Sequence, residues 1–407
     1  MNDDAYMPQE TGSHLAYQAL QAVIAKQRFQ ELPDSPWPTA FLHNEGAAGI
    51  AQLRPVESDG TFSVEPPDRS KPLINLMWSQ RTEMSDLDAD VLDILSAIWL
   101  RQARTPLDIA VVTIDECLRM RGLEPKLSGS GRRGGFSSRQ REEFLYALGR
   151  IESTWLTILQ VESRAFVMTA RWGQMRLDGR IHVKQPFIFR PGEIFSQFLF
   201  GPGRQTMLLS VKAVQYDYYR HTWEKRLTRY FSWLWRADMA KPGVMFPFKV
   251  SALLDCADIT SKAPPRFPNR VRERLEKALD TLVEDAVISN WRYAATAEIE
   301  QRRRKWYSAW LSQTVEIGPP RQILDLYSRN LASSSRDTRG SVSDGGGMGR
   351  DVRVRREQLG LSQTAAAARI GIDRTLLSRI EQNKRNPSRN DLPKIERWLH
   401  SGVGTKD

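Results

Sequence analysis

The sequence predicts a mainly α-helical protein with small β wings, an α+β fold in which two similar central blocks precede a linker and an all-α C-terminal domain. Three observations lead to this prediction. Apolar residues recur at three- and four-residue steps through most of the chain, as one-sided helices require. Two central stretches share an order of helices and short β-type runs. A Ser-, Gly- and Asp-rich segment then separates these stretches from a compact helical end.

Residues 1–72 are predicted to be an N-terminal appendage, partly disordered. They hold one plausible helix over about 14–32, followed by Pro-broken chain with weak apolar patterning. A segment that buries little apolar surface cannot offset the entropy lost on ordering. No function follows from this part of the sequence.

The first central block, residues 73–203, has the element order of a winged helix: helix, strand, helix, helix, hairpin. Helices are expected over 85–102, 115–121 and 138–155, with a strand at 110–114. Ser85 can cap the first helix, whose inward stripe consists of Leu87, Val91, Leu95, Ile98 and Trp99. Two pairs of β-type runs end the block, 155–161 with 164–170 and 174–183 with 186–192. Arg139 and Arg141 lie on the first turn of the helix over 138–155, outside its apolar stripe.

The second central block, residues 204–327, repeats this scheme and so predicts a second winged helix. A long aromatic helix over 218–239, a strand with a short helix over 246–258, and a helix over 269–285 precede wing strands at 286–293 and 310–318. The helix over 269–285 is the expected recognition helix. Arg270, Arg274 and Lys277 follow one another at helical spacing on its outer side. Such a stripe is often only a solvated face, but its place before a hairpin favours DNA contact.

Residues 328–349 form the predicted flexible linker, and residues 350–407 form the predicted helix-turn-helix domain. In the latter, Gly371 supplies the turn between two helices and Asp373 can cap the second. Arg374, Thr375 and Leu376 then fall on the first turn of the second helix, the positions that enter a major groove in a helix-turn-helix. Residues 350–400 hold twelve Arg and Lys against six Asp and Glu, and twelve minus six gives a net charge of +6. This charge favours DNA over the alternatives that the bundle binds protein or self-associates.

The C-terminal string LGLSQTAAAARIGIDRTLLSRIEQNKRNPS resembles the lambda-repressor/Cro type of helix-turn-helix. The Leu-Ser-Gln opening and the Arg-Ile-Glu-x-x-Lys-x-x-Pro ending carry the resemblance. It implies that Gln363 binds a phosphate and that Arg374, Thr375 and Arg379 face base edges. It also implies a structural, buried ion pair between Arg356 and Glu381.

The central layout of two tandem winged helices, over about 73–327, resembles the initiators of iteron-type plasmid replication, the Rep family of bacteria. The best local matches are WEKRLTRYFSWLW and FPNRVRERLEKALDTLVEDAVISNW. The resemblance implies that the second winged helix makes the main contacts to repeated origin sites, through Arg270, Arg272 and Arg274. The first would help in dimerisation and contact DNA more weakly through Arg139 and Arg141. It further implies recruitment of host helicase.

The residues that several enzyme classes need are missing from the sequence. A rolling-circle nickase requires a His-hydrophobic-His metal pair beside a Tyr nucleophile, but His182 stands alone. An ATP-driven initiator requires a phosphate loop with a Lys, and residues 129–136 have the glycines without it. Cys117 and Cys256 lack Cys or His neighbours at metal spacing and are expected to be reduced. We therefore expect no enzymatic activity, no metal and no cofactor.

Composition also indicates where the protein is located and what kind of partner it binds. The 407 residues carry a formal net charge of +11, which favours nucleic acid before an acidic membrane surface. No run of 18 apolar residues and no signal-peptide core occur, so we expect a cytoplasmic protein that does not span a membrane. The leading hypothesis is a plasmid replication initiator that binds double-stranded DNA at repeated origin sites. The alternative is a transcriptional regulator that binds an operator through its C-terminal domain.

Overall fold

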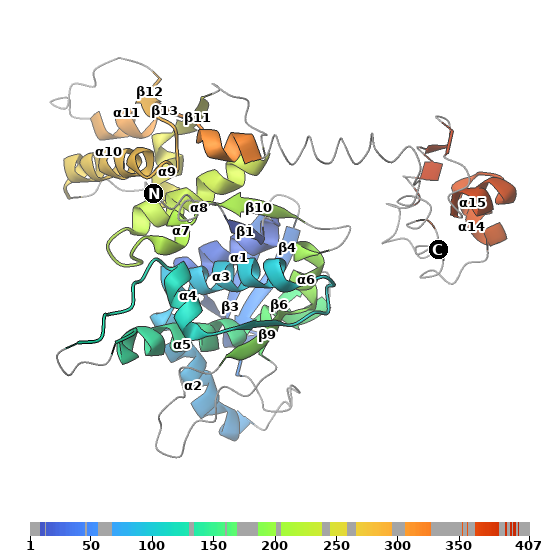
Figure 1. The fold of residues 1–407 in the computed structure, drawn as a ribbon, viewed down its shortest axis with the longest axis horizontal. Helices are drawn as coiled ribbons and strands as arrows, with labels where there is room; N and C mark the ends of the chain where they lie inside the picture. The colour runs from blue at the N-terminus through green and yellow to red at the C-terminus, as the bar shows by residue number, and fades with distance from the viewer. Residues whose placement is uncertain are drawn as a thin grey trace. The chain divides into compact units, whose positions relative to one another are not determined.

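The computed structural model combines helices and β-sheets in two compact units, residues 1–324 and 325–407, and each unit is described by itself. In the first unit it describes residues 9–12, 14–44, 47–55, 67–129, 134–158, 161–168, 186–200, 205–237, 245–258, 266–294 and 306–324. In the second it describes residues 325–326, 352, 356, 363–381, 387–388, 391–392, 394–395 and 398. The predicted linker, 328–349, lies outside these residues. Figure 1 shows the elements.

The N-terminal residues fold into the core of the first unit, which corrects the prediction of an appendage. Their elements are β1 (Gln9–Gly12), α1 (Leu15–Ala25), β2 (Gln30–Leu32), β3 (Ser35–Asn44), β4 (Ala47–Leu53) and α2 (Pro67–Glu83). Tyr17, Leu20 and Ile24 of α1 are buried in one cluster with apolar residues from the first central block. This packing could not be predicted from the local sequence, because the residues that cover α1 come from distant parts of the chain.

Five antiparallel strands form the sheet that joins the N-terminal residues to the first block, in the order β2-β3-β4-β6-β7. β6 (Thr154–Ile158) pairs with β4 on one side and with β7 (Val161–Arg164) on the other. The sequence predicted that residues 155–161 and 164–170 would pair with each other inside the first block. This pairing is wrong for most of the second run: β6 pairs with residues 161–164, and residues 166–168 pair with residues 189–191 in a different sheet. Residues 30–53 complete the sheet that holds β6. The predicted run 174–183 lies outside the described residues.

The remaining elements of the first block follow the predicted order. They are α3 (Asp86–Gln102), β5 (Ala110–Val112), α4 (Ile114–Met120), α5 (Ser138–Glu152), β8 (Phe166–Met168), β9 (Phe187–Pro191) and α6 (Glu193–Leu199). Three of the helices begin at side-chain caps with a reciprocal hydrogen bond, provided by Ser85, Thr113 and Ser137. The short strands form a sheet in the order β5-β9-β8, so the first and last strands of the block lie side by side.

The second block repeats the series helix, strand, helix, helix and the strand order of the sheet, and it adds a helix before its last strand where the sequence predicted only a wing strand over 310–318. Its elements are β10 (Thr206–Leu209), α7 (Lys212–Gln215), α8 (Thr222–Ala237), β11 (Phe246–Lys249), α9 (Val250–Cys256), α10 (Pro268–Glu284), β12 (Trp291–Tyr293), α11 (Trp306–Leu311) and β13 (Thr314–Ile317). The sheet order is β11-β13-β12. β10 pairs with β1, so the start of this block also binds the N-terminal residues. In Figure 1, α8 lies between α3 and the sheet of the second block.

A buried seam of opposite charges joins α3 to α8. Lys225 Nζ lies 2.8 Å from Asp90 Oδ1, and both side chains are fully buried. Arg229 donates to Asp93 at 2.8 Å and to Asp90 at 2.5 Å, and Arg226 contacts Asp86 at 2.9 Å. α3 is therefore buried on all sides along Asp86–Trp99, whereas the sequence indicated only one apolar face.

Burial disfavours the charged form of every group in this seam, so it shifts the pKa of acidic and basic side chains in opposite directions. It raises the pKa of Asp86 and Asp93 despite the arginines beside them. It lowers the pKa of Lys225 to about 8, while Asp90 works against this shift. Side chains that are costly to bury are thus held by partners of opposite charge, and removing one partner leaves the other unpaired.

The second unit contains α14 (Gln363–Ile370) and α15 (Arg374–Glu381). Gly371 has φ of +76°, a left-handed conformation that favours glycine, and ends α14 as predicted. Asp373 Oδ1 accepts hydrogen bonds from the backbone of Thr375 and Leu376 and caps α15, also as predicted. These bonds lower the pKa of Asp373. The core is small and apolar: Val352, Ala366, Ala367, Ile370, Leu377, Ile380, Ile395 and Trp398.

Candidate nucleic-acid interface

The outer side of α15 presents the predicted base-reading residues to solvent. Arg374, Thr375 and Arg379 are all exposed. The opposite side of the helix is fixed by Leu377 and Ile380, which are buried in the small core. No carboxylate partner is recorded for Arg374 or Arg379 among the described residues of this unit. An exposed arginine without a carboxylate partner can form a bidentate pair with guanine.

Behind this surface, three polar side chains meet in one cluster. Arg356 donates to both carboxylate oxygens of Glu381, at 2.7 and 3.2 Å, which confirms the predicted ion pair. Glu381 is only 3% exposed. Gln363 Nε2 donates to the same carboxylate at 2.7 Å. The expected phosphate contact of Gln363 stays a prediction, and here its amide positions the first turn of α14 against α15.

On α10, the structure divides the four predicted DNA-contacting residues into two pairs. Arg274 donates to both oxygens of Glu224 on α8, each at 2.6 Å, and Glu224 is 2% exposed. Arg272 pairs with Glu276 at 2.8 Å one turn along the same helix. Arg274 thus fixes α10 to α8, and both guanidinium groups have intramolecular partners.

The other two residues, Arg270 and Lys277, are exposed, and no carboxylate partner is recorded for either within the described part of the chain. The guanidinium of Arg270 lies 4.7 Å from the centre of the Phe267 ring, and that of Arg266 lies 5.4 Å from it. Phe267 is 51% exposed at the start of α10. The sequence analysis did not single out Phe267 and Arg266. Their position beside a proline that begins a basic helix was the available signal.

The corresponding helix of the first block, α5, presents little positive charge. Arg141 donates to both oxygens of Asp115 on α4, at 2.7 and 2.8 Å. Arg139 is exposed but pairs with Glu143 at 2.8 Å, one turn along α5. Glu142 adds a further exposed carboxylate to the same helix. The predicted basic loop at 129–136 falls partly outside the described residues.

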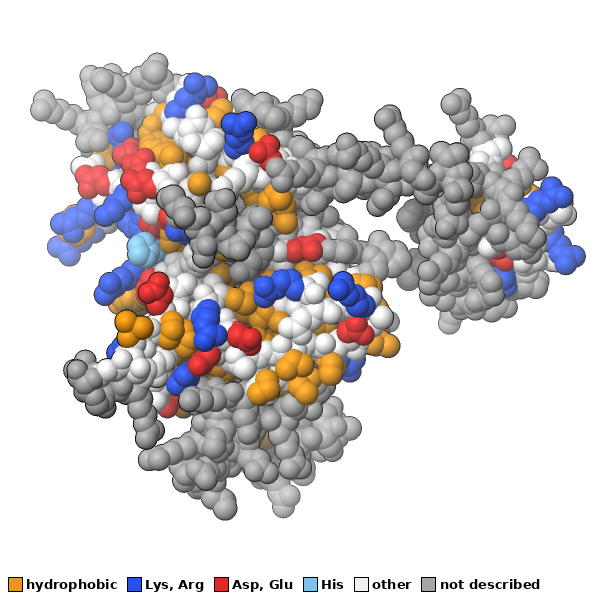
Figure 2. Space-filling model, in the orientation of Figure 1, with side chains coloured by type: hydrophobic (Ala, Val, Ile, Leu, Met, Phe, Trp, Pro, Cys, Tyr) orange, Lys and Arg blue, Asp and Glu red, His pale blue; other side chains and the backbone are white. Residues whose placement is uncertain are grey.

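Surface charge is mixed on the face that Figure 2 shows. Blue Lys and Arg side chains alternate with red Asp and Glu, without a large patch of one sign among the residues that are coloured. Phosphate contact at this surface would therefore depend on individual projecting cations. Among the described residues, no helix is long and apolar enough to cross a membrane. In the same residues, no group of three or more His, Cys, Asp or Glu could hold a metal ion.

Residues 352–399 match the family described as Helix-turn-helix. A domain of this family indicates that the chain binds double-stranded DNA. Among solved structures, the chain is similar to a crystal structure of selenomethionine derivatives of domain 2 and domain 3 of RctB. That likeness has a TM-score of 0.39 and 12% identity, and it covers 74% of this chain and 98% of the other. The comparison with curated proteins gave no match.

Proposed function

We propose that the chain is a sequence-specific double-stranded DNA-binding protein that initiates replication of a plasmid by binding repeated origin sites. One observation carries the replication part of the proposal. Both blocks contain the series helix, strand, helix, helix, as α3-β5-α4-α5 and α8-β11-α9-α10, and both three-stranded sheets have their last strand in the middle, β5-β9-β8 and β11-β13-β12. This is the layout expected of tandem winged helices over 73–203 and 204–327. With the C-terminal domain at 350–407, the chain would hold three DNA-binding modules.

Several modules in one chain suit a target made of repeated sites. Once one module is bound, the others meet DNA at a high effective concentration, on the order of millimolar for a short flexible connection. Each phosphate that a Lys or Arg neutralises also releases counterions. We include in the proposal a homodimer, recruitment of host helicase, a cytoplasmic location and the absence of bond-breaking chemistry.

A plasmid that lacks its own origin provides the test. The gene and its flanking DNA are placed on such a plasmid, and stable transformants are counted. We expect transformants with the wild-type gene and few with the double variant Arg270→Ala, Lys277→Ala. A gene that supports no replication, while the purified protein still binds specific DNA, would contradict initiation and leave DNA binding intact.

A transcriptional regulator is the second candidate, favoured by the separate C-terminal unit with its exposed Arg374 and Arg379. A reporter placed downstream of the gene's own promoter separates the two functions. Repression that is lost in Arg374→Ala, together with no replication of the origin-less plasmid, would favour regulation. Cutting of a supercoiled plasmid by purified protein would contradict both proposals, because neither includes strand cleavage.

A further inference from the structure

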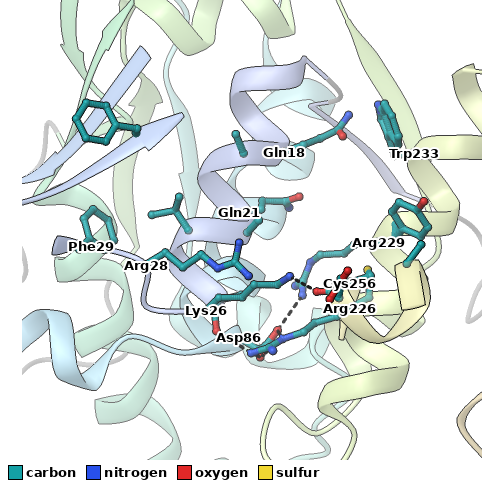
Figure 3. A pocket seen from close by; sticks show the side chains of 18 of the residues that line it. Gln18, Gln21, Lys26, Arg28, Phe29, Asp86, Arg226, Arg229, Trp233 and Cys256 are labelled. Carbon is teal, nitrogen blue, oxygen red and sulfur yellow. Dashed lines mark hydrogen bonds and ion pairs between the residues drawn. The ribbon is translucent and has the colours of Figure 1, made fainter. Parts of the chain in front are cut away.

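A cleft opens in the first unit between α1 and α8. Its volume is about 880 Å³, within the range of roughly 300–1,000 Å³ typical of small-molecule sites. The turn after α1 and the side of α9 also line the cleft, which Figure 3 shows from close by. The cleft therefore lies where the N-terminal residues meet the second block. None of the DNA-binding candidates lines it.

Most of the cations that line the cleft are paired with carboxylates. Four cations, Lys26, Arg28, Arg226 and Arg229, line it together with two carboxylates, Asp86 and Asp255. Asp86 is engaged by Arg226 at 2.9 Å. Arg229 is also paired with Asp90 and Asp93, and Arg28 is paired with Asp258. Among the described residues Lys26 has no such carboxylate partner, so its charge favours an anionic ligand.

Lys26 and Arg229 have hydrogen-bonding capacity that the surrounding protein does not fill. The recorded hydrogen bond of Lys26 Nζ goes to a neutral acceptor, the backbone oxygen of Asp255, at 2.8 Å. An ammonium group has three donors. Burial, together with the nearby Arg28 and Arg226, lowers the pKa of Lys26. Nη1 of Arg229 is buried without a hydrogen-bond partner in the described structure, and its ion-pair contact to Asp86 measures 3.6 Å.

The rest of the lining is largely apolar and aromatic. Tyr230 and Trp233 of α8 are half-buried and adjacent, with ring centres 6.5 Å apart. Phe29, Phe41 and Met207 also line the cleft. Figure 3 shows Trp233 on the α8 side and Lys26 extending from the end of α1 towards the side where Cys256 lies. A ligand with a charged head and a ring would contact both kinds of surface.

We propose that this cleft binds a small organic anion whose acidic head contacts Lys26 and whose ring packs on Tyr230 and Trp233. The anion supplies a counter-ion for Lys26, and the ring removes exposed aromatic surface from water. Because α1 belongs to the N-terminal residues and α8 to the second block, the bound ligand holds these two parts together. The site is independent of DNA contact.

The probe is 8-anilinonaphthalene-1-sulfonate, an anion with aromatic rings whose fluorescence rises in apolar sites. Titration into the full-length protein is expected to saturate at one site. Lys26→Met should weaken binding about ten-fold, as the loss of one charged hydrogen bond implies, and Trp233→Leu should also weaken it. Lys277→Met is the matched control, because it removes an exposed lysine outside the cleft, and should leave the affinity unchanged.

Lys26→Arg keeps the positive charge and should retain binding, which separates the role of charge from any effect on folding. Melting curves of all variants, measured without probe, check the fold. Benzoate, which has a ring and a carboxylate, should displace the probe at lower concentration than inorganic phosphate. Equal affinity of the wild type and Lys26→Met, fluorescence that never saturates, or displacement by phosphate alone would each overturn the proposal.

Discussion

α5 and α10 each end a series of helix, strand, helix, helix in their blocks, yet they present different surfaces. Both carry arginines near their first turn. On α5, Arg141 is bound to Asp115, and Arg139 faces Glu143. On α10, Arg274 is bound to Glu224, but Arg270 and Lys277 project without a recorded carboxylate partner in the described residues. A basic residue on the outer side of a helix is thus available to DNA only when no neighbouring element supplies its counter-ion.

The largest effect is expected where the first helices of both blocks meet. Asp90→Ala leaves Lys225 buried without its carboxylate and should reduce the free energy of unfolding by about 3–5 kcal/mol. Urea denaturation followed by circular dichroism measures this. Glu142→Ala, which removes an exposed carboxylate, is the control and should leave the midpoint unchanged. A stable Asp90→Ala protein would mean that the seam does not hold α3 to α8.

Arg274→Ala is expected to lower stability by about 1–3 kcal/mol, because Glu224 is then buried without its partner. A double-mutant cycle with Glu224→Ala measures the coupling: the double variant should be less destabilised than the sum of the single variants. Additive losses would show that the pair contributes nothing, and Arg274 would return to the set of DNA-contacting candidates.

Arg374→Ala should weaken specific DNA binding by about 1–3 kcal/mol and relax the preference at one base position, if α15 lies in a major groove. Selection of sites from random DNA, before and after the substitution, measures both effects. Thermal stability should stay the same, since the side chain is exposed. An identical selected site would exclude Arg374 as a base-reading residue.

Arg270→Ala with Lys277→Ala should reduce DNA affinity equally for all sequences, if both side chains contact phosphates. The slope of log affinity against log salt is negative, and each lost phosphate contact reduces its magnitude by about 0.9. The salt dependence of the double variant should therefore be shallower by about 2. Titrations at several salt concentrations measure the slope, and Arg274→Ala serves as the comparison on the same helix. A slope that does not change would show that these two side chains of α10 do not contact the phosphates of the DNA backbone.

The smallest effect is expected for Arg139→Ala on α5. The side chain is 88% exposed and its pair with Glu143 is solvated, so neither the unfolding midpoint nor DNA affinity should change measurably. The same assays apply. A clear loss of affinity would remove the distinction between α5 and α10.

Several elements could be predicted because their causes are local. Side-chain caps and apolar spacing place α3, α5 and α10 within a few residues of their observed bounds. The turn at Gly371 and the cap at Asp373 follow from single residues. At the candidate interface, the exposed residues of α15 followed from the same reasoning, because its apolar stripe fixes which side faces solvent.

Other features depend on partners far away in the chain. Asp90 and Lys225 are 135 residues apart, and nothing in either local sequence indicates that both are buried. The pairing of β6 with β4 likewise makes the N-terminal residues part of the central sheet, which their weak apolar patterning did not predict.

The sequence alone determined the excess of positive charge, the helical spacing, the repeated order of elements and the C-terminal helix-turn-helix, because composition and periodicity act within a few turns of chain. Only the tertiary structure decided which cations are available. A charged side chain pairs with whatever carboxylate the fold brings within hydrogen-bonding distance. That is why Arg274 fixes α10 in place while Arg270, four residues earlier on the same helix, remains exposed.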